Sequence, residues 1–87
     1  MEVTKWPSSR VLQHTILQSF ASESKRLTNE QIFKYTSSIL GLPPELLYLM
    51  HSPTRSELEY RLAWARTKLA KANLIRRVGP KVWEIVP

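Results

Sequence analysis

The chain contains 87 residues, which is enough for one small domain with a single modest hydrophobic core. It has no cysteine, so a disulfide scaffold and a thiolate metal site are excluded, and its two histidines, His14 and His51, have no partner at ligand spacing. No apolar run approaches the ~18 residues of a membrane span, and the first residues lack the apolar core of a secretion signal. We therefore expect a cytoplasmic chain without a metal or cofactor.

The net charge of +6 is unevenly distributed along the chain. Residues 51–81 hold eight of the 13 basic residues and two of the 7 acidic ones, whereas residues 1–50 hold five basic and four acidic residues. A positive field confined to one part of the chain favours a polyanionic partner. A solvated helix face rich in Lys and Arg is the alternative interpretation.

The first predicted helix runs from Arg10 to about Ser22, after a lead-in of residues 1–7. Ser8 or Ser9 can cap its first turn. Apolar residues recur there every four positions, which places one face of the helix in the core. The residues of this stripe are Leu12, Ile16 and Phe20.

A second helix is predicted from Thr28, because Thr28 and Gln31 have the spacing of a capping box. Gly41 is suited to the left-handed position that ends it. The pair Arg26-Leu27 just before this helix is a candidate for a short strand. The expected buried face of the helix consists of Ile32, Thr36, Ile39 and Leu40.

A short helical turn is expected over Glu45–Met50, followed by a break at residues 51–53. Its expected core residues are Leu46, Leu47, Leu49 and Met50. The third helix then begins at Thr54, with Glu57 completing a second capping box, and ends at Asn73. Its core stripe consists of Leu58, Leu62, Ala65, Leu69 and Ala72.

Two β-type runs, Leu74–Arg77 and Val82–Val86, flank a tight turn that contains Gly79-Pro80. We expect the face of this hairpin with Trp83 and Ile85 to be buried. The predicted fold class is therefore α+β and mainly helical. Residues 8–87 form a winged helix-turn-helix with three main helices and a C-terminal β-hairpin wing.

This layout predicts DNA binding, with the third helix in the major groove and the wing on the backbone. The first turns of the helix supply the expected base-reading side chains, and cations flanking its core stripe or lying in the wing supply phosphate contacts. Charges that protect an edge hairpin from pairing are the alternative for the wing. The candidate DNA-binding residues are Arg55, Ser56, Glu59, Tyr60, Arg61, Lys68, Arg76, Arg77 and Lys81.

Two aromatic residues on the third helix are candidates for contact with a modified base. Tyr60 points away from the core stripe, where it can contact DNA or remain a half-exposed aromatic residue. Trp64 lies about 120° from the centre of the stripe. We expect Trp64 to pack against the hairpin or the first helix; an exposed ring available to a base is the alternative.

The run from Tyr60 to Ile75, followed by Val78 to Ile85, resembles the N-terminal winged-helix domain of Mrr-type restriction endonucleases. In that family Arg-x-x-Trp-Ala on the last helix precedes Leu-x-x-Ala-Gly-Leu and a wing of the pattern Arg-Gly-x-Trp/Tyr-x-Ile. The Arg-Gly of that wing is shifted in this sequence, which has Val78-Gly79-Pro80. The resemblance covers about Pro7 to Val86, with Tyr60 in place of the usual Asn and Asn73 in place of the Gly. The matching positions are Arg61, Trp64, Ala65, Leu69, Ala72, Leu74, Trp83 and Ile85.

The resemblance implies a non-catalytic recognition domain of a restriction endonuclease that acts on modified, typically methylated, double-stranded DNA. It also implies native fusion to a nuclease or other effector domain and association with the nucleoid. A methylated base would be sensed by apolar contact in the major groove or after flipping into an aromatic-lined pocket. The sequence shows no nuclease core, nucleophile–base set or phosphate loop.

Two other functions are compatible with the same fold. The first is a stand-alone transcriptional regulator, although no spare helix or heptad run offers the dimer surface that such proteins use. The second is a winged helix used as a protein-interaction module, which would present an exposed apolar patch.

Overall fold

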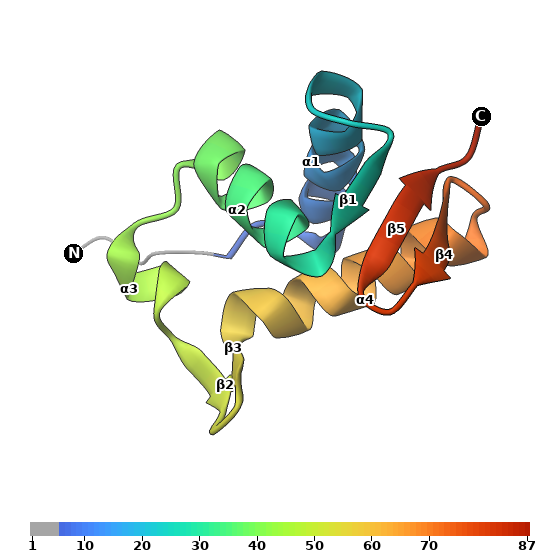
Figure 1. Ribbon diagram of the computed structural model, residues 1–87. Helices are drawn as coiled ribbons and strands as arrows, with labels where there is room; N and C mark the ends of the chain where they lie inside the picture. The colour runs from blue at the N-terminus through green and yellow to red at the C-terminus, as the bar shows by residue number, and fades with distance from the viewer. Residues whose placement is uncertain (1–5) are drawn as a thin grey trace.

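Four helices and two antiparallel sheets make up the structure, a computed structural model that describes residues 6–87 (Figure 1). Residues 1–5 of the predicted lead-in lie outside the described residues. The helices are α1 (Ser9–Ser22), α2 (Asn29–Leu40), α3 (Pro44–Leu47) and α4 (Glu57–Lys71). The strands are β1 (Arg26–Thr28), β2 (Met50–Ser52), β3 (Arg55–Ser56), β4 (Ile75–Gly79) and β5 (Val82–Ile85).

Strands from the two halves of the chain form the larger sheet, in the order β1-β5-β4. Strand β1 is antiparallel to β5, with Arg26 opposite Glu84 and Leu27 opposite Trp83, and β4 and β5 form the C-terminal hairpin. The predicted short strand at Arg26-Leu27 is therefore confirmed. Three main helices with a small sheet that ends in a hairpin form a winged helix, which confirms the predicted fold class.

The hydrophobic core lies between α1, α2, α4 and the larger sheet. Its most buried members are Leu12, Ile16, Phe20, Leu27, Ile32, Leu58, Leu62, Ala65, Leu69 and Ile75. The predicted stripes of the first and third helices are thus confirmed, except that Ala72 is exposed just beyond the end of α4. Ile39 in the last turn of α2 is also exposed, contrary to prediction, whereas the adjacent Leu40 packs against the core. Trp83 and Ile85 pack against the core, as predicted.

Local side-chain chemistry sets the helix ends. Ser8 caps α1 by accepting the N–H of Val11, and Thr28 and Gln31 form the predicted capping box of α2. After α2 and α4, Gly41 and Asn73 adopt left-handed φ angles of 61° and 60°. These conformations allow the backbone to turn away from the helix, as the sequence predicted.

The segment after α3 differs from the prediction. The helical turn expected over Glu45–Met50 ends at Leu47, and Leu49 and Met50 are exposed instead of joining the core. The Leu49 carbonyl accepts the N–H of Glu57 at 2.8 Å, which ties this segment to the start of α4. The chain therefore leaves the helical conformation before it can bury these two side chains.

An antiparallel hairpin of β2 and β3, absent from the sequence prediction, precedes α4. Thr54 lies in the turn of this hairpin, so the predicted capping box of Thr54 and Glu57 is wrong. Ser56 caps the helix instead, and α4 begins at Glu57. As a result, Arg55 lies in a strand before the helix and not in its first turn.

Candidate nucleic-acid interface

Two of the predicted base-reading residues form the cap of α4. Ser56 Oγ accepts the N–H of Glu59 at 3.1 Å, and Glu59 Oε1 accepts the N–H of Ser56 at 2.8 Å. These bonds satisfy two donors that have no partner within the first turn of the helix. Ser56 is buried, and the Glu59 carboxylate is engaged. Both residues therefore determine where α4 begins, beside the β2–β3 hairpin.

The β2–β3 hairpin is attached to the first two turns of α4 through His51. The His51 and Tyr60 rings stack with centroids 3.7 Å apart and planes inclined by 12°. Nδ1 of His51 lies 3.1 Å from Glu57 Oε1, and Glu57 Oε2 accepts Nε–H of Arg61 at 2.7 Å. Burial raises the pKa of Glu57, but the bonds to His51 and Arg61 outweigh it and lower the pKa below 4.5. The hairpin thus holds Tyr60 and Arg61 in defined positions.

Trp64 lies on the outer surface of α4, with 54% of the residue exposed. The prediction that it packs against the hairpin or the first helix is wrong. The space between α4 and the wing is filled by Arg66 and Trp83: Arg66 Cζ lies 5.7 Å from the centroid of the Trp83 ring. Trp83 in turn donates its indole N–H to Asn29 Oδ1 at 2.7 Å. Trp83, and not Trp64, is therefore the tryptophan that joins the wing to the helices.

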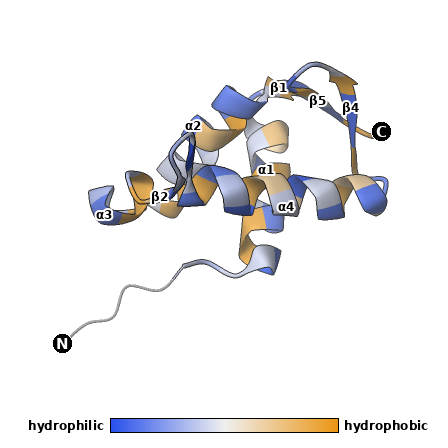
Figure 2. Ribbon diagram, turned by 90° about the horizontal axis from the view of Figure 1, so that it is seen from below, coloured by the Kyte–Doolittle hydropathy of each residue, from blue (hydrophilic) through white to orange (hydrophobic). Residues whose placement is uncertain are grey.

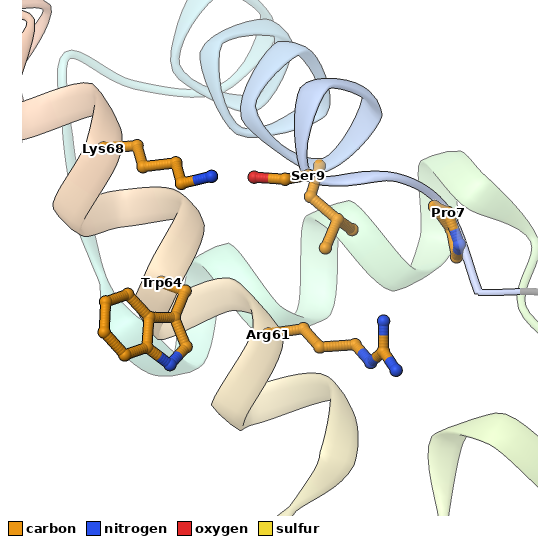
Figure 3. Close-up of a pocket in the computed structure, with 6 residues that line it drawn as sticks. Pro7, Ser9, Arg61, Trp64 and Lys68 are labelled. Atoms are coloured by element: carbon orange, nitrogen blue, oxygen red, sulfur yellow. The ribbon is translucent and has the colours of Figure 1, made fainter.

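A small groove, which we call the Trp64 groove, lies between α4 and the start of α1 (Figure 3). It has a volume of about 230 Å³ and is lined by Pro7, Ser9, Leu12, Arg61, Trp64 and Lys68. Figure 3 shows Arg61 and Lys68 extending from α4 toward the side on which Ser9 and Pro7 lie, whereas the Trp64 ring, from the same helix, points away from them. Arg61 contacts two other side chains: its Cζ lies 4.7 Å from the centroid of the Trp6 ring, and its Nε–H donates to Glu57.

A second groove, which we call the Arg66 groove, has a volume of about 650 Å³. It lies between the first turn of α2, α3, the β2–β3 hairpin, the first half of α4 and the tip of the wing. The charged and polar side chains that line it include Asn29, Glu30, Arg55, Glu59, Arg66 and Lys81. It brings together Arg55 and Lys81, two predicted DNA-binding residues that are 26 positions apart in sequence.

The wing carries three of the predicted phosphate contacts in different environments. Arg76 donates two bonds to Glu84 Oε2, at 3.0 and 2.6 Å, and Arg26 donates to Oε1 of the same carboxylate at 3.0 Å. Hydrogen bonds from Arg76 and Arg26 lower the pKa of Glu84. Arg77 is exposed and donates only to the Gly79 carbonyl, at 3.3 Å. Arg76 is thus partly neutralised, whereas Arg77 keeps its full charge available.

Lys81 lies at the tip of the wing in a left-handed conformation, with φ of 58°. Its carbonyl accepts the N–H of Asn29 at 2.9 Å, which fixes the wing tip against the start of α2. Among residues 6–87, no acidic side chain forms an ion pair with Lys81, nor with Arg55, Lys68 or Lys71. These cations are available to an external anion.

The β2–β3 hairpin, α4 and the wing turn lie along the same lower side of the molecule in Figure 1. Figure 2 views this side directly and shows α4 running across it, with hydrophilic positions along the length of the helix. Arg55 and Lys81 line the Arg66 groove, whereas Arg61 and Lys68 line the Trp64 groove on the other side of α4. The predicted DNA-binding residues therefore occupy both sides of one helix and the adjacent wing.

Residues 6–87 contain no group of three or more His, Asp or Glu side chains placed to hold a metal ion. No helix within the same residues has the length and apolar character needed to cross a membrane.

Comparison with known families gives one match. The profile of the Mrr N-terminal domain family matches residues 11–87, which is nearly the whole chain. Searches of curated proteins and of solved structures returned no significant match. The match confirms the resemblance seen in the sequence and places the chain in the context of restriction systems. The chain belongs to the Mrr N-terminal domain family.

Proposed function

We propose that this chain is the target-recognition module of a modification-dependent restriction endonuclease and binds double-stranded DNA that carries a methylated base. Membership of the Mrr N-terminal domain family over residues 11–87 is the observation that carries this proposal. The winged-helix arrangement, with unpaired cations beside α4 and on the wing, supports it. DNA cleavage would belong to a nuclease domain fused to this one.

In this proposal α4 enters the major groove, and the wing lies on the neighbouring backbone. Ser56 and Glu59 are engaged in the helix cap, so base reading falls mainly to Arg55 and Tyr60. Phosphate contacts fall to the cations at the sides of α4 and on the wing, which carry no sequence information by themselves. These cations are Arg61, Lys68, Arg76, Arg77 and Lys81.

The exposed Trp64 is the better candidate for contact with a modified base. The stacked His51 covers one face of the Tyr60 ring, whereas the Trp64 ring is more than half exposed. A methyl group in the major groove is recognised by apolar contact, and an exposed indole provides such a surface. The proposal therefore assigns methyl sensing to Trp64 and leaves Tyr60 with Arg55 as a base-reading residue.

The test is binding to matched duplexes, unmodified or containing N6-methyladenine or 5-methylcytosine, over a series of salt concentrations. We expect tighter binding to one modified duplex at every salt concentration, and we expect Trp64→Ala to remove that preference while leaving the salt dependence unchanged. Equal binding of all duplexes would contradict modification sensing. The absence of binding at low salt would contradict DNA recognition altogether.

Base reading and phosphate contact can be separated by two double variants. The pair Arg55→Ala and Tyr60→Ala should reduce discrimination between duplex sequences by about 1–3 kcal/mol for each lost base contact. The pair Arg77→Ala and Lys81→Ala should weaken all duplexes about equally and make the salt dependence shallower. If neither pair changes binding, the assigned DNA-facing side is wrong.

One observation favours a second function, that of a protein-interaction module. Tyr48, Leu49 and Met50 are consecutive and exposed, with Tyr48 at 79% exposure. Such a cluster of apolar side chains is a feature of protein-binding surfaces. This function predicts DNA binding that is weak and indifferent to sequence, so the duplex titration distinguishes it from the first proposal.

A further inference from the structure

Arg66 is a charged residue that is buried without a hydrogen-bond acceptor for its Nε–H. Only 9% of the residue is exposed, and its Nε has no hydrogen-bond partner. It is the single buried side-chain nitrogen or oxygen atom within residues 6–87 that lacks a partner. Burial of a cation without a compensating acceptor is costly, so such a group calls for a specific explanation.

The surroundings of Arg66 explain why it has no partner within the chain. The residue one turn earlier on α4 is the apolar Leu62, whereas Arg61 has Glu57 at the equivalent position. Glu59 lies close enough to act on Arg66 through space, but its carboxylate is bonded to the N–H of Ser56 and forms no ion pair with the guanidinium. The Trp83 ring covers Arg66 at 5.7 Å but accepts no hydrogen bond from it.

Further cations converge on the same place. Arg55, Arg66 and Lys81 all line the Arg66 groove, which also contains the carboxylates of Glu30 and Glu59. Burial and, next, the neighbouring charge of Arg55 lower the pKa of Arg66 to about 10, so the guanidinium remains protonated at neutral pH. Positive charges that are held together without a bonded acceptor create a site at which an anion is favoured.

We propose that the Arg66 groove holds one phosphodiester group of bound DNA, which accepts hydrogen bonds from the Arg66 guanidinium, while Arg55 and Lys81 add positive charge at the same groove. The planar guanidinium presents parallel N–H donors that match two phosphate oxygens. The Trp83 ring holds the guanidinium in place before DNA arrives. The inference rests on the proposed function and adds to it a built site for one phosphate, in which a buried residue is the main ligand.

The position of the groove fits this role. It lies between α2, α3, the β2–β3 hairpin, α4 and the tip of the wing, and the proposed complex places α4 and the wing against DNA. A backbone phosphate beside the major groove would lie between the helix and the wing. Because the wing tip is tied to Asn29, the distance across the groove is fixed by the fold.

The first test compares Arg66→Met with the matched control Arg10→Met, which removes one exposed cation from α1 outside the groove. Met preserves much of the buried volume and removes the charge. We expect R66M to bind duplex about tenfold more weakly at low salt or worse, with the slope of log affinity against log salt shallower by about one. The loss should be the same for modified and unmodified duplexes, and R10M should resemble the wild type.

Urea unfolding of R66M shows whether reduced binding follows from a damaged fold. We expect its midpoint to be no lower than that of the wild type, because the substitution removes a desolvated charge that has no partner. A folded R66M that binds duplex like the wild type would overturn the phosphate site but leave DNA recognition intact. A wild-type chain that binds no duplex would overturn both.

Nuclear magnetic resonance provides a direct readout at the proposed ligand. The Arg66 Nε–H signal, assigned by its loss in R66M, should shift on addition of duplex, while the corresponding signal of Arg10 stays in place. Inorganic phosphate alone at the same phosphate concentration should produce little shift, because it lacks the remaining contacts of the duplex. A shift with inorganic phosphate but none with duplex would identify a free phosphate as the ligand and overturn the DNA assignment.

Discussion

The two grooves beside α4 each contain an arginine from that helix. Arg61 is paired with a carboxylate, whereas Arg66 has no acceptor. In the Trp64 groove, Arg61 lies over Trp6 and donates to Glu57 at 2.7 Å. In the Arg66 groove, Arg66 lies near Trp83 and has no acceptor, and Arg55 repels it. The Trp64 groove is smaller and displays an exposed indole, whereas the Arg66 groove is larger and is lined by three cations, Arg55, Arg66 and Lys81, and two carboxylates.

The contrast shows that the positive charge of a helix does not by itself locate a binding site. Arg61 is already paired with Glu57, a carboxylate that also contacts His51 of the β2–β3 hairpin, so it attracts an incoming anion less strongly than an unpaired arginine does. A desolvated arginine without an acceptor, such as Arg66, has N–H donors that an anionic ligand can accept from. We therefore assign apolar recognition to the Trp64 groove and anion recognition to the Arg66 groove.

The largest effects should come from residues that support both grooves. Leu12 lines the Trp64 groove and Leu62 lines the Arg66 groove, and both are almost fully buried in the common core. Leu12→Ala and Leu62→Ala should each lower the free energy of unfolding by about 2–5 kcal/mol. Urea denaturation measures this loss. If one substitution were nearly neutral, the two grooves would not share a core as described.

The next effect concerns the start of α4, which lines the Arg66 groove. Ser56→Ala removes the capping hydroxyl and should lower the free energy of unfolding by about 1 kcal/mol. Thr54→Ala is the matched control, because Thr54 lies in the hairpin turn and does not cap the helix. A larger loss for Thr54→Ala in thermal or urea unfolding would place the start of the helix where the sequence first predicted it.

A smaller effect compares the two arginines directly in the absence of DNA. Arg61→Met removes a partly exposed ion pair and should lower the free energy of unfolding by about 0.2–1 kcal/mol. Arg66→Met should cause no loss, because the removed charge has no partner in the free chain. Side-by-side urea titrations test this difference in sign. A clear loss for Arg66→Met alone would reveal a favourable contact of the guanidinium within the chain.

The smallest effect is a pH dependence of stability that comes from Glu57, the partner of Arg61 in the Trp64 groove. The pKa of Glu57 is lowered in the folded chain, so its ionised form stabilises the fold above pH 4.5, and this contribution is lost as the pH falls through the folded pKa. Glu57→Gln lacks this contribution. Its free energy of unfolding should therefore fall less than that of the wild type between about pH 6 and about pH 3. Parallel slopes for the two proteins would contradict the role of the contacts with His51 and Arg61.

Several parts of the fold were predictable because short-range chemistry determines them. The apolar repeat of Leu12, Ile16 and Phe20 predicted the buried face of α1, and Thr28 with Gln31 predicted the cap of α2. Each of these signals involves residues within about one helical turn of one another, where geometry is set by the 3.6-residue period. The family resemblance could also be recognised from the sequence, because residues of α4 and the wing carry it as a local motif.

The β2–β3 hairpin was not predictable in the same way. Strands of two and three residues are too short to show an alternating pattern, and Pro53 marks only the presence of a turn. The hairpin depends on contacts with α4, namely the His51–Tyr60 stack and the bond from the Glu57 N–H to the Leu49 carbonyl. The residues assigned to the first turn of the helix shifted by two positions as a result.

The sequence alone was enough to predict the fold class, the main helices, the wing and the family, because those depend on periodicity, capping and local motifs. Only the tertiary structure decided that Trp64 is exposed and that Arg66 lacks an acceptor. Trp64 and Arg66 lie on opposite sides of α4, and their surroundings come from α1 in one case and from α2 and the wing in the other. Burial and charge pairing depend on neighbours that are distant in sequence, so they arise only when the core brings these elements together.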